Sequence, residues 1–166
     1  MKQKYLVLLS LSGLILSLDQ LTKGYVHSAL PLGFRRSLIP NFLSFVHARN
    51  TGYALDILKS APEPLKEVFL IGIPVFALFL IVLIFIKLQD SHIQTSVALT
   101  CIFGGAIGNL VDRIKYGYVV DFVELKFGSL FQFPPFNIAD FSIIAGVLVM
   151  FYNTLLSERH KGNAKA

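Results

Sequence analysis

The chain has 166 residues, of which 54% are hydrophobic and only 15% are charged. This composition is too apolar for a soluble domain of this length, so it excludes an ordinary soluble fold and predicts a membrane protein. The 15 lysines and arginines give a formal net charge of +5. They are scattered over loops and tails without a basic stripe, so anionic lipid headgroups explain them better than nucleic acid does.

Four apolar stretches are long enough to cross a bilayer, which takes about 20 residues per helix. We expect transmembrane helices at approximately residues 5–23, 68–87, 93–112 and 138–156. The first stretch follows Lys2 and Lys4 and could instead be a cleavable secretory signal. No small-x-small cleavage site follows it, and the polar residues 19–23 can extend a helix. We therefore interpret it as a retained span.

Four spans would place both termini on one side of the membrane and two polar connections on the other. Lysine and arginine residues number six on the side of the termini and nine on the side of the connections. Because lysine and arginine are enriched in cytoplasmic loops, this count by itself favours placing the two connections in the cytoplasm. Lys2 and Lys4 flank the first helix, which usually dominates orientation, and they favour cytoplasmic termini. We follow the first helix and expect the termini in the cytoplasm.

The two connections, approximately residues 24–66 and 113–137, are expected to form a small extramembrane β-cap. A β-rich run at 42–46 leads to a turn at Asn50-Thr-Gly52. Together with the four helices, this predicts an all-α membrane protein with a small β-cradle. We expect residues 1–166 to form a single integral membrane domain.

The second connection contains two β-rich runs joined by Gly128-Ser129, which predicts a β-hairpin. If these two residues form the turn, Asp121 lies opposite Phe136. The hairpin then returns the chain to Asn137, a good N-cap for the last helix, and to Asp140 in its first turn. The sequence therefore predicts that Asp121 and Asp140 converge at the membrane boundary.

Each aspartate also has a purely structural interpretation. Asp140 could serve only as a helix-capping residue, and Asp121 could be a solvated strand residue. Their convergence favours chemistry, because carboxylates close enough to share a proton provide one base and one acid together. Such a pair can activate water against an amide. The histidines lack the spacing of metal ligands, and we expect neither metal nor cofactor. The GxSxG motif of serine hydrolases is absent as well.

Other polar and small residues are placed near these two aspartates. Asp19 and Lys23 stand four residues apart, as in a helical ion pair or a site that shapes the substrate path. Asn109 and Arg113 could orient the connection carrying Asp121, with Asp112 holding Arg113 in place. In the helices, Pro74 predicts a kink. Gly104 and Gly108 predict close helix packing, with approach of a substrate backbone as the alternative.

Five motifs in order resemble the lipoprotein signal peptidase (signal peptidase II) family over almost the whole chain. They are Asp19-Gln-Leu-Thr-Lys23, Asn50-Thr-Gly52, Gly104-Gly-Ala-Ile-Gly-Asn109-Leu-Val-Asp112-Arg113, Gly117-Tyr-Val-Val-Asp121-Phe and Phe136-Asn-Ile-Ala-Asp140. The resemblance implies four transmembrane helices with a periplasmic β-cradle. It also implies an aspartic endopeptidase of the bacterial inner membrane that cuts the signal peptide of a prolipoprotein just before its diacylglyceryl-modified cysteine.

The resemblance also implies roles for single residues. Asp121 and Asp140 match the catalytic pair, whereas Asn109, Arg113 and Asn137 match supporting polar positions. Positions around the substrate or inhibitor groove are matched by Asp19, Lys23, Asn50, Gly52 and Gly105. The implied partners are lipid-modified prolipoproteins and the phospholipid bilayer, and we expect a monomer with its active site on the periplasmic face.

The chain departs from the family after Asn50-Thr-Gly52, where the usual Ala-Ala-Phe is replaced by Tyr53-Ala54-Leu55-Asp56. This change bears on the shape of the groove and on substrate preference, but not on the two aspartates. Two other functions remain as alternatives. The aspartates could form a proton relay in a transporter, although no inverted repeat is visible. The chain could also be a non-catalytic scaffold subunit.

Overall fold

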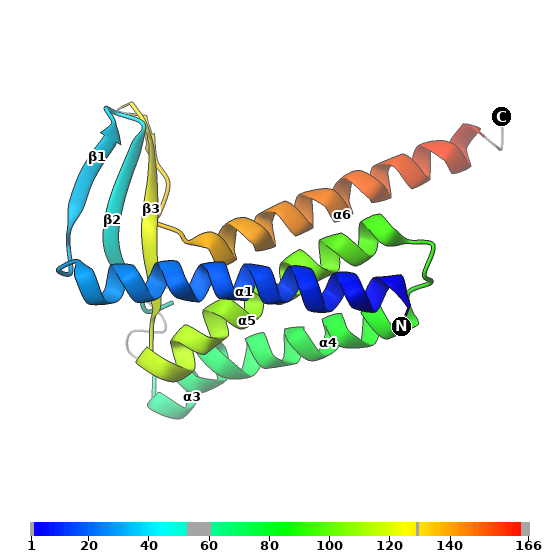
Figure 1. Ribbon diagram of the computed structural model, residues 1–166, viewed down its shortest axis with the longest axis horizontal. Helices are drawn as coiled ribbons and strands as arrows, with labels where there is room; N and C mark the ends of the chain where they lie inside the picture. The colour runs from blue at the N-terminus through cyan, green and yellow to red at the C-terminus, as the bar shows by residue number, and fades with distance from the viewer. Residues whose placement is uncertain (1, 53–60, 129, 164–166) are drawn as a thin grey trace.

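The computed structural model describes residues 2–52, 61–128 and 130–163, with side chains up to residue 156. Four long helices run alongside one another, and a small sheet stands across one end of them (Figure 1). The two termini lie at the opposite end. All four helices are long and apolar enough to cross a membrane. The predicted architecture of four spans with an extramembrane β-cradle is therefore confirmed.

The helices are longer than predicted at their ends. The first is α1 (Gln3–Ala29), the third is α5 (Ile93–Tyr116) and the fourth is α6 (Ile138–Asn163). The second span is built from α3 (Glu63–Glu67), a π-helical turn η1 (Val68–Gly72) and α4 (Ile73–Lys87). The approximate limits expected at residues 23, 68 and 112 therefore lie inside helical segments that continue to Ala29, begin at Glu63 and continue to Tyr116.

Two local features shape the second span. Pro74 lies in the first turn of α4, directly after the π-helical turn η1. Proline has no N–H to donate, so the predicted irregularity appears as a change of hydrogen-bond pattern in the preceding turn. At the other end, the Lys4 ammonium donates to the carbonyl oxygens of Phe85, Ile86 and Leu88 at 3.3, 3.2 and 2.5 Å. Lys4, which belongs to α1, thereby caps the C-terminal carbonyl groups of α4.

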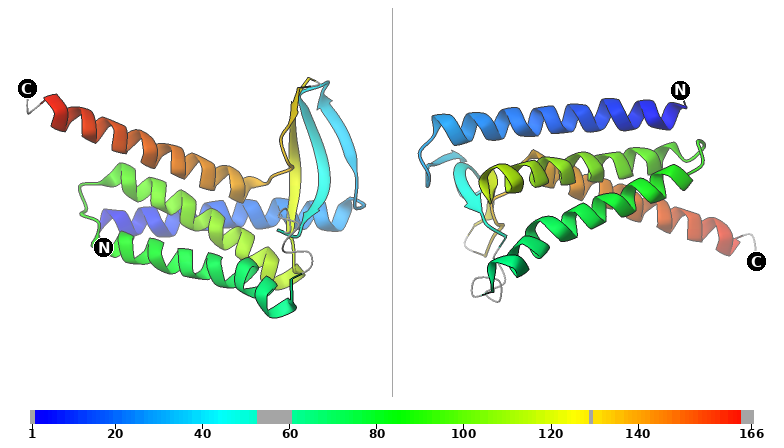
Figure 2. Two further views of the ribbon diagram at one scale, coloured as in Figure 1. Left: turned by 180° about the vertical axis from the view of Figure 1, so that it is seen from behind. Right: turned by 90° about the horizontal axis from the view of Figure 1, so that it is seen from below.

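Helix α5 is the most buried of the four spans and packs against the other three. Its glycines allow this, since Gly104 approaches Ser12 and Ile15 of α1 and Gly108 approaches Asp19. The packing interpretation of these glycines is therefore confirmed. α6 runs beside α5 near the sheet and diverges from the bundle toward its C-terminal end (Figure 2).

The sheet has four antiparallel strands in the order β1-β2-β3-β4. They are β1 (Arg35–Ile39), β2 (Leu43–Asn50), β3 (Val119–Phe127) and β4 (Phe131–Gln132). Strand β3 follows α5 after Gly117, whose φ of 77° ends the helix in the left-handed conformation. Val26, Val120 and Phe122 form a small core between α1 and the sheet.

The predicted hairpin exists, but its register differs from the prediction. Phe127 pairs with Phe131 and Lys126 with Gln132, so the loop has three residues rather than two. This register alone would place Phe136 opposite Phe122, but Phe136 forms a bridge with Val123, and neither position is Asp121. Pro134 and Pro135 cannot continue a hydrogen-bonded ladder, which shifts the returning chain. Asp121 is instead fixed from the other side, where it pairs with Ala48 of β2.

Candidate active site

The side chain of Asn137 links the two aspartates that the sequence singled out. Its Nδ2 donates to Asp121 Oδ1 at 2.7 Å, while its Oδ1 accepts the backbone N–H of Asp140 at 2.9 Å. Asn137 lies at the point where the irregular chain after β4 enters α6 and is 1% exposed. The N-cap of the last helix therefore brings the strand aspartate and the helix aspartate to one amide group, as the sequence predicted.

Asp121 lies near the start of β3, as its third residue, and is 1% exposed. Hydrogen bonds from the Asn50 and Asn137 side chains reach its carboxylate. Burial is the largest cause that raises the pKa of Asp121, and the nearby charge of Asp140 adds to it, so this pKa lies at about 7. The hydrogen bonds and the charge of Lys23 act in the opposite direction without cancelling the effect. At neutral pH this carboxyl can therefore hold a proton.

Asp140 sits in the first turn of α6 with both oxygens engaged. Oδ1 accepts from Asn109 Nδ2 at 2.7 Å, and Oδ2 accepts from the backbone N–H of Asn137 at 3.3 Å. The reciprocal bonds between Asn137 and Asp140 form a capping box. The capping role considered for Asp140 is thus real, and it fixes the carboxylate beside the positive end of a helix.

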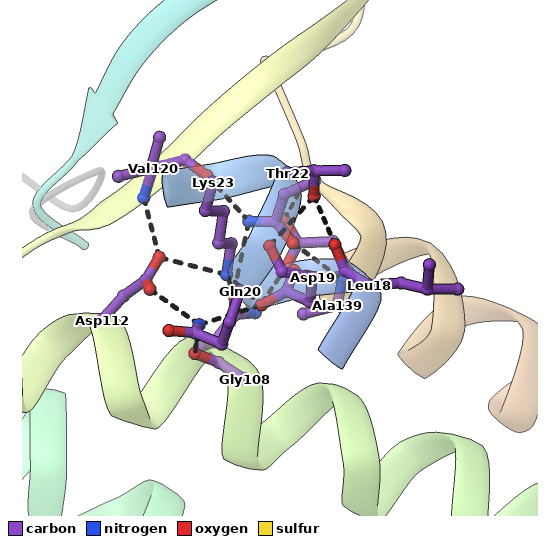
Figure 3. Close-up of polar contacts among 12 residues, drawn as sticks. Leu18, Asp19, Gln20, Thr22, Lys23, Gly108, Asp112, Val120 and Ala139 are labelled. Atoms are coloured by element: carbon purple, nitrogen blue, oxygen red, sulfur yellow. Dashed lines mark hydrogen bonds and ion pairs between the residues drawn. The ribbon is translucent and has the colours of Figure 1, made fainter. Parts of the chain in front are cut away.

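Asp19, Lys23 and Asp112 form a buried charge network (Figure 3), and this network contacts Asn109 through Lys23. The Lys23 ammonium contacts Asn109 Oδ1 at 2.9 Å, Asp19 Oδ2 at 2.8 Å and Asp112 Oδ2 at 3.1 Å. Its three N–H donors are therefore matched by three acceptors. Because Lys23 occupies the oxygen of the Asn109 amide, the nitrogen of that amide must face Asp140.

The two carboxylates of this network also fix the surrounding backbone. Asp19 Oδ1 accepts the N–H of Ala139 at 2.9 Å, and Asp112 Oδ2 accepts the N–H of Val120 at 3.1 Å. Ala139 precedes Asp140 and Val120 precedes Asp121. Asp19 and Asp112 are both fully buried, as is Lys23 to within 1%. The structure therefore places Asp19 and Lys23 behind the two aspartates, where they hold the backbone on which these stand.

Gln20 belongs to the same network and was missed by the sequence reasoning. Its Nε2 lies within hydrogen-bond distance of Asp19, Asp112 and the carbonyl oxygen of Gly108. Its place in the motif, directly after Asp19, was the available signal. Gln20 joins α1 to α5 through these hydrogen bonds. It therefore stabilises the packing of α1, which carries Lys23, against α5.

Arg113 takes a different position from the one expected. The bonds of Asp112 go to Lys23, Gln20 and Val120, so Lys23 is the cation that Asp112 holds. Arg113 lies near the charges of Asp140, Asp121 and Asp112, and its buried Nε has no hydrogen-bond partner in the described part of the chain. Its guanidinium supplies positive charge beside both aspartates.

A cleft of about 310 Å³ opens beside Asp140. Its walls are formed by Asn50, by the segment 133–136 and by Ile143 and Ile144 of α6. The lining is mainly aromatic and aliphatic, with one carboxylate and one amide, so an extended apolar chain could lie against Asp140 here. Gly52 follows this wall with a φ of 71°, and its N–H donates to Asn50 Oδ1 at 3.0 Å. The departure at Tyr53-Ala54-Leu55-Asp56 lies outside the described residues.

Glu124 is a second residue that the sequence reasoning missed. It is 2% exposed and joins both edges of the sheet, since it forms a bidentate ion pair with Arg35 of β1 and accepts from Gln132 of β4. The hydrogen bonds from Arg35 lower the pKa of Glu124. Phe133, which follows β4, lines the cleft. Glu124 therefore anchors the wall opposite Asp140.

Gly105 packs against α6 rather than lining this cleft. A methyl group at this position would overlap the carbonyl oxygen of Ala139 and the hydroxyl of Ser142. We expect Gly105→Ala to separate α5 from α6 and to destabilise the protein by roughly 1–3 kcal/mol. Thermal unfolding in detergent measures this effect. Gly24→Ala is the control, because nothing lies within 4 Å of its added methyl group, and it should be neutral or slightly stabilising.

Within residues 2–52, 61–128 and 130–163, no group of three or more His, Cys, Asp or Glu side chains could hold a metal ion. The side chains that meet at the site supply two carboxyl groups, three amides and a guanidinium. The aspartates differ in environment: one is buried with a raised pKa, and the other is fixed by two N–H donors.

Comparisons with known proteins identify relatives of this chain. The family model of signal peptidase (SPase) II matches residues 11–156. Lipoprotein signal peptidases of Syntrophus aciditrophicus and Enterococcus faecalis are 35% and 37% identical to this chain. These alignments cover 97% and 90% of this chain and 99% and 88% of the relatives.

A solved bacterial membrane enzyme, determined at 2.3 Å resolution, has a similar structure with a TM-score of 0.79. It is 31% identical, and the alignment covers 95% of this chain and 90% of that one. A second bacterial membrane enzyme, at 1.9 Å resolution, gives a TM-score of 0.77 at 32% identity. The four-helix architecture, the matched length and the family model lead to one conclusion: the chain belongs to the signal peptidase II family of membrane peptidases.

Proposed function

We propose that Asp121 and Asp140 are the catalytic pair of an aspartic endopeptidase that removes signal peptides from lipid-modified prolipoproteins. The observation that carries this proposal is the single Asn137 amide, which bonds the carboxylate of Asp121 and the backbone of Asp140. Proteins of this family are lipoprotein signal peptidases. The cut falls just before the diacylglyceryl-modified cysteine.

The two carboxyl groups divide the chemistry between them. Asp140, as the carboxylate, takes a proton from a water molecule, and the resulting hydroxide attacks the carbonyl carbon of the scissile amide. Asp121 holds a proton in a large fraction of the molecules at neutral pH, because burial and the charge of Asp140 raise its pKa to about 7. It donates a hydrogen bond to the carbonyl oxygen as negative charge develops there. As the tetrahedral intermediate collapses, Asp140 passes the proton that it took from water to the leaving amine, and the C–N bond breaks.

The cleft beside Asp140 suits a substrate that arrives from the membrane. Its walls include Ile143 and Ile144 on the lipid-exposed side of α6 and the aromatic segment 133–136 at the edge of the sheet. An apolar signal peptide can lie along α6 while the lipid anchor of the cysteine remains in the bilayer. The scissile bond then stands at the level of Asp140, where the spans end and water begins.

The location of the site suggests a topology. The sheet and the two aspartates lie at one end of the helices and the termini at the other. With Lys2 and Lys4 in the cytoplasm, the aspartates face the periplasmic side of the bacterial inner membrane. One chain supplies both aspartates and the described walls of the cleft, so a monomer has the groups that this mechanism needs.

Cleavage of a diacylglyceryl-modified prolipoprotein by the purified chain in detergent tests this function. We expect cleavage of the modified precursor, no cleavage of the same precursor without its lipid, and no activity in an Asp121→Asn/Asp140→Asn variant. A folded wild-type protein that leaves the modified precursor intact would contradict the proposal. Proton flux in proteoliposomes would instead support the transporter alternative.

The pH dependence should follow the proton on Asp121. Since its pKa is raised to about 7, the proton is present below this pH and is lost as the pH rises through it. We expect kcat/KM to decline above about pH 7. The free energy of unfolding should also decrease between the ordinary pKa of 3.8 and about 7, because the folded state there binds a proton that the unfolded chain has released. Activity that stays constant well above this range would exclude Asp121 as the acid.

A further inference from the structure

Three aromatic rings, those of His27, Tyr116 and Tyr118, stack where α1 and α5 end beside the sheet. The rings of His27 and Tyr116 lie 4.5 Å apart between centroids, and those of Tyr116 and Tyr118 lie 5.7 Å apart. His27 Nε2 is 3.0 Å from the hydroxyl oxygen of Tyr118. All three side chains are partly exposed. They form a rigid platform that joins α1, α5 and the start of β3.

Two cations flank this platform. The guanidinium carbon of Arg49 lies 4.6 Å from the ring centroid of Tyr118, and the Lys115 ammonium lies 4.7 Å from that of Tyr116. Both side chains are exposed, and neither forms an ion pair with a carboxylate among the described residues. Arg35, by contrast, is paired with Glu124. The rings order Arg49 and Lys115 without neutralising their charge.

The position of the platform points to its ligand. His27 and Tyr116 lie in the last turns of two membrane spans, so their rings are at the boundary between hydrocarbon and water. Tyrosine is favoured at this depth, and cations beside it reach the phosphate groups of lipids. Side chains alternate along a strand, so Arg49 faces away from Asn50, which lines the cleft.

We propose that Arg49 and Lys115, supported by Tyr116, Tyr118 and His27, form a binding surface for the anionic headgroups of bilayer phospholipids. The guanidinium and the ammonium donate to phosphate oxygens, and the tyrosine rings lie between the headgroups. Binding holds the ends of α1 and α5 and strand β2 at a fixed depth. The surface is independent of the catalytic pair, so it can be tested whether or not the proposed peptidase activity is found.

Lipid binding to the full chain in detergent micelles tests this proposal. Phosphatidylglycerol or phosphatidylcholine is titrated into the protein, and the bound lipid is counted by native mass spectrometry. We expect selective retention of phosphatidylglycerol. Arg49→Gln/Lys115→Gln should weaken its apparent affinity by roughly 25-fold, since each cation near an anionic surface contributes about fivefold. Arg36→Gln/Lys126→Gln removes two exposed cations of the sheet and should leave the affinity nearly unchanged.

Several outcomes would overturn the proposal. Equal affinity for the two lipids, or equal loss in both double variants, would show that this surface is not selective. Displacement of the lipid by inorganic phosphate at comparable concentration would identify a site for free anions instead. Circular dichroism checks the fold of each variant. Should the double variant fail to fold, Lys115→Gln alone changes an exposed side chain and should still reduce the affinity about fivefold; an unchanged affinity there would refute the assignment.

Discussion

Asp140→Asn is expected to lower kcat for prolipoprotein cleavage by roughly 10³-fold or more, with little change in KM. The substituted amide can still accept the N–H of Asn137, so the capping box is largely retained, but it cannot take a proton from water. Asp121→Asn should produce a loss of similar size, because an amide N–H is a much weaker hydrogen-bond donor than a carboxylic acid to the carbonyl oxygen on which negative charge develops. Steady-state cleavage of a lipid-modified precursor in detergent measures both variants.

The same experiment separates a chemical role from a structural one. Each variant should retain its helical circular dichroism and should still bind a non-cleavable precursor, since the cleft beside Asp140 is unchanged. Glu124→Gln is a useful comparison: it weakens the ion pair that anchors the cleft wall, so it should raise KM more than it lowers kcat. If either aspartate variant keeps near wild-type kcat while folded, that aspartate is not part of the catalytic pair.

Lys23→Met should have the largest effect on stability. It leaves the buried carboxylates of Asp19 and Asp112 without their cation, and breaking such a pair on one side costs about 3–5 kcal/mol. Activity should fall as well, because the Asn109 amide loses the contact that orients it toward Asp140. Chemical unfolding in mixed micelles measures the stability, and the cleavage assay measures the activity.

Compensating variants test this electrostatic explanation. Lys23→Met/Asp19→Asn/Asp112→Asn removes both unpaired charges and should recover much of the lost stability. Its activity should remain low, since the oriented Asn109 amide is not restored. Lys126→Met, at an exposed position of β3, should change the free energy of unfolding by about 0.5 kcal/mol or less. A triple variant as unstable as Lys23→Met would show that packing around the lysine stem, and not charge, explains the effect.

The sequence alone was sufficient for the membrane architecture and for the two aspartates. Span length and hydropathy are properties of short continuous segments, so the four helices could be predicted from the residue composition of each segment. The convergence of Asp121 and Asp140 could be predicted because a hairpin and an N-cap are also local signals, at Gly128-Ser129 and Asn137. An error of one residue in the hairpin did not matter, since Asn137 brings the two aspartates together by its side chain.

Only the tertiary structure decided which charges pair and why the aspartates differ. Lys23 meets Asn109 86 residues away, and Asp19 meets the N–H of Ala139 120 residues away. No sequence period specifies such contacts, so Asp112 was assigned to Arg113 instead of Lys23, and Glu124 was missed. The raised pKa of Asp121 likewise comes from burial beneath packed elements and from the charge of Asp140. Hydropathy along the sequence determined which segments form the membrane spans. Burial and long-range packing determined which charges pair beside the two aspartates and why the pKa of Asp121 is raised.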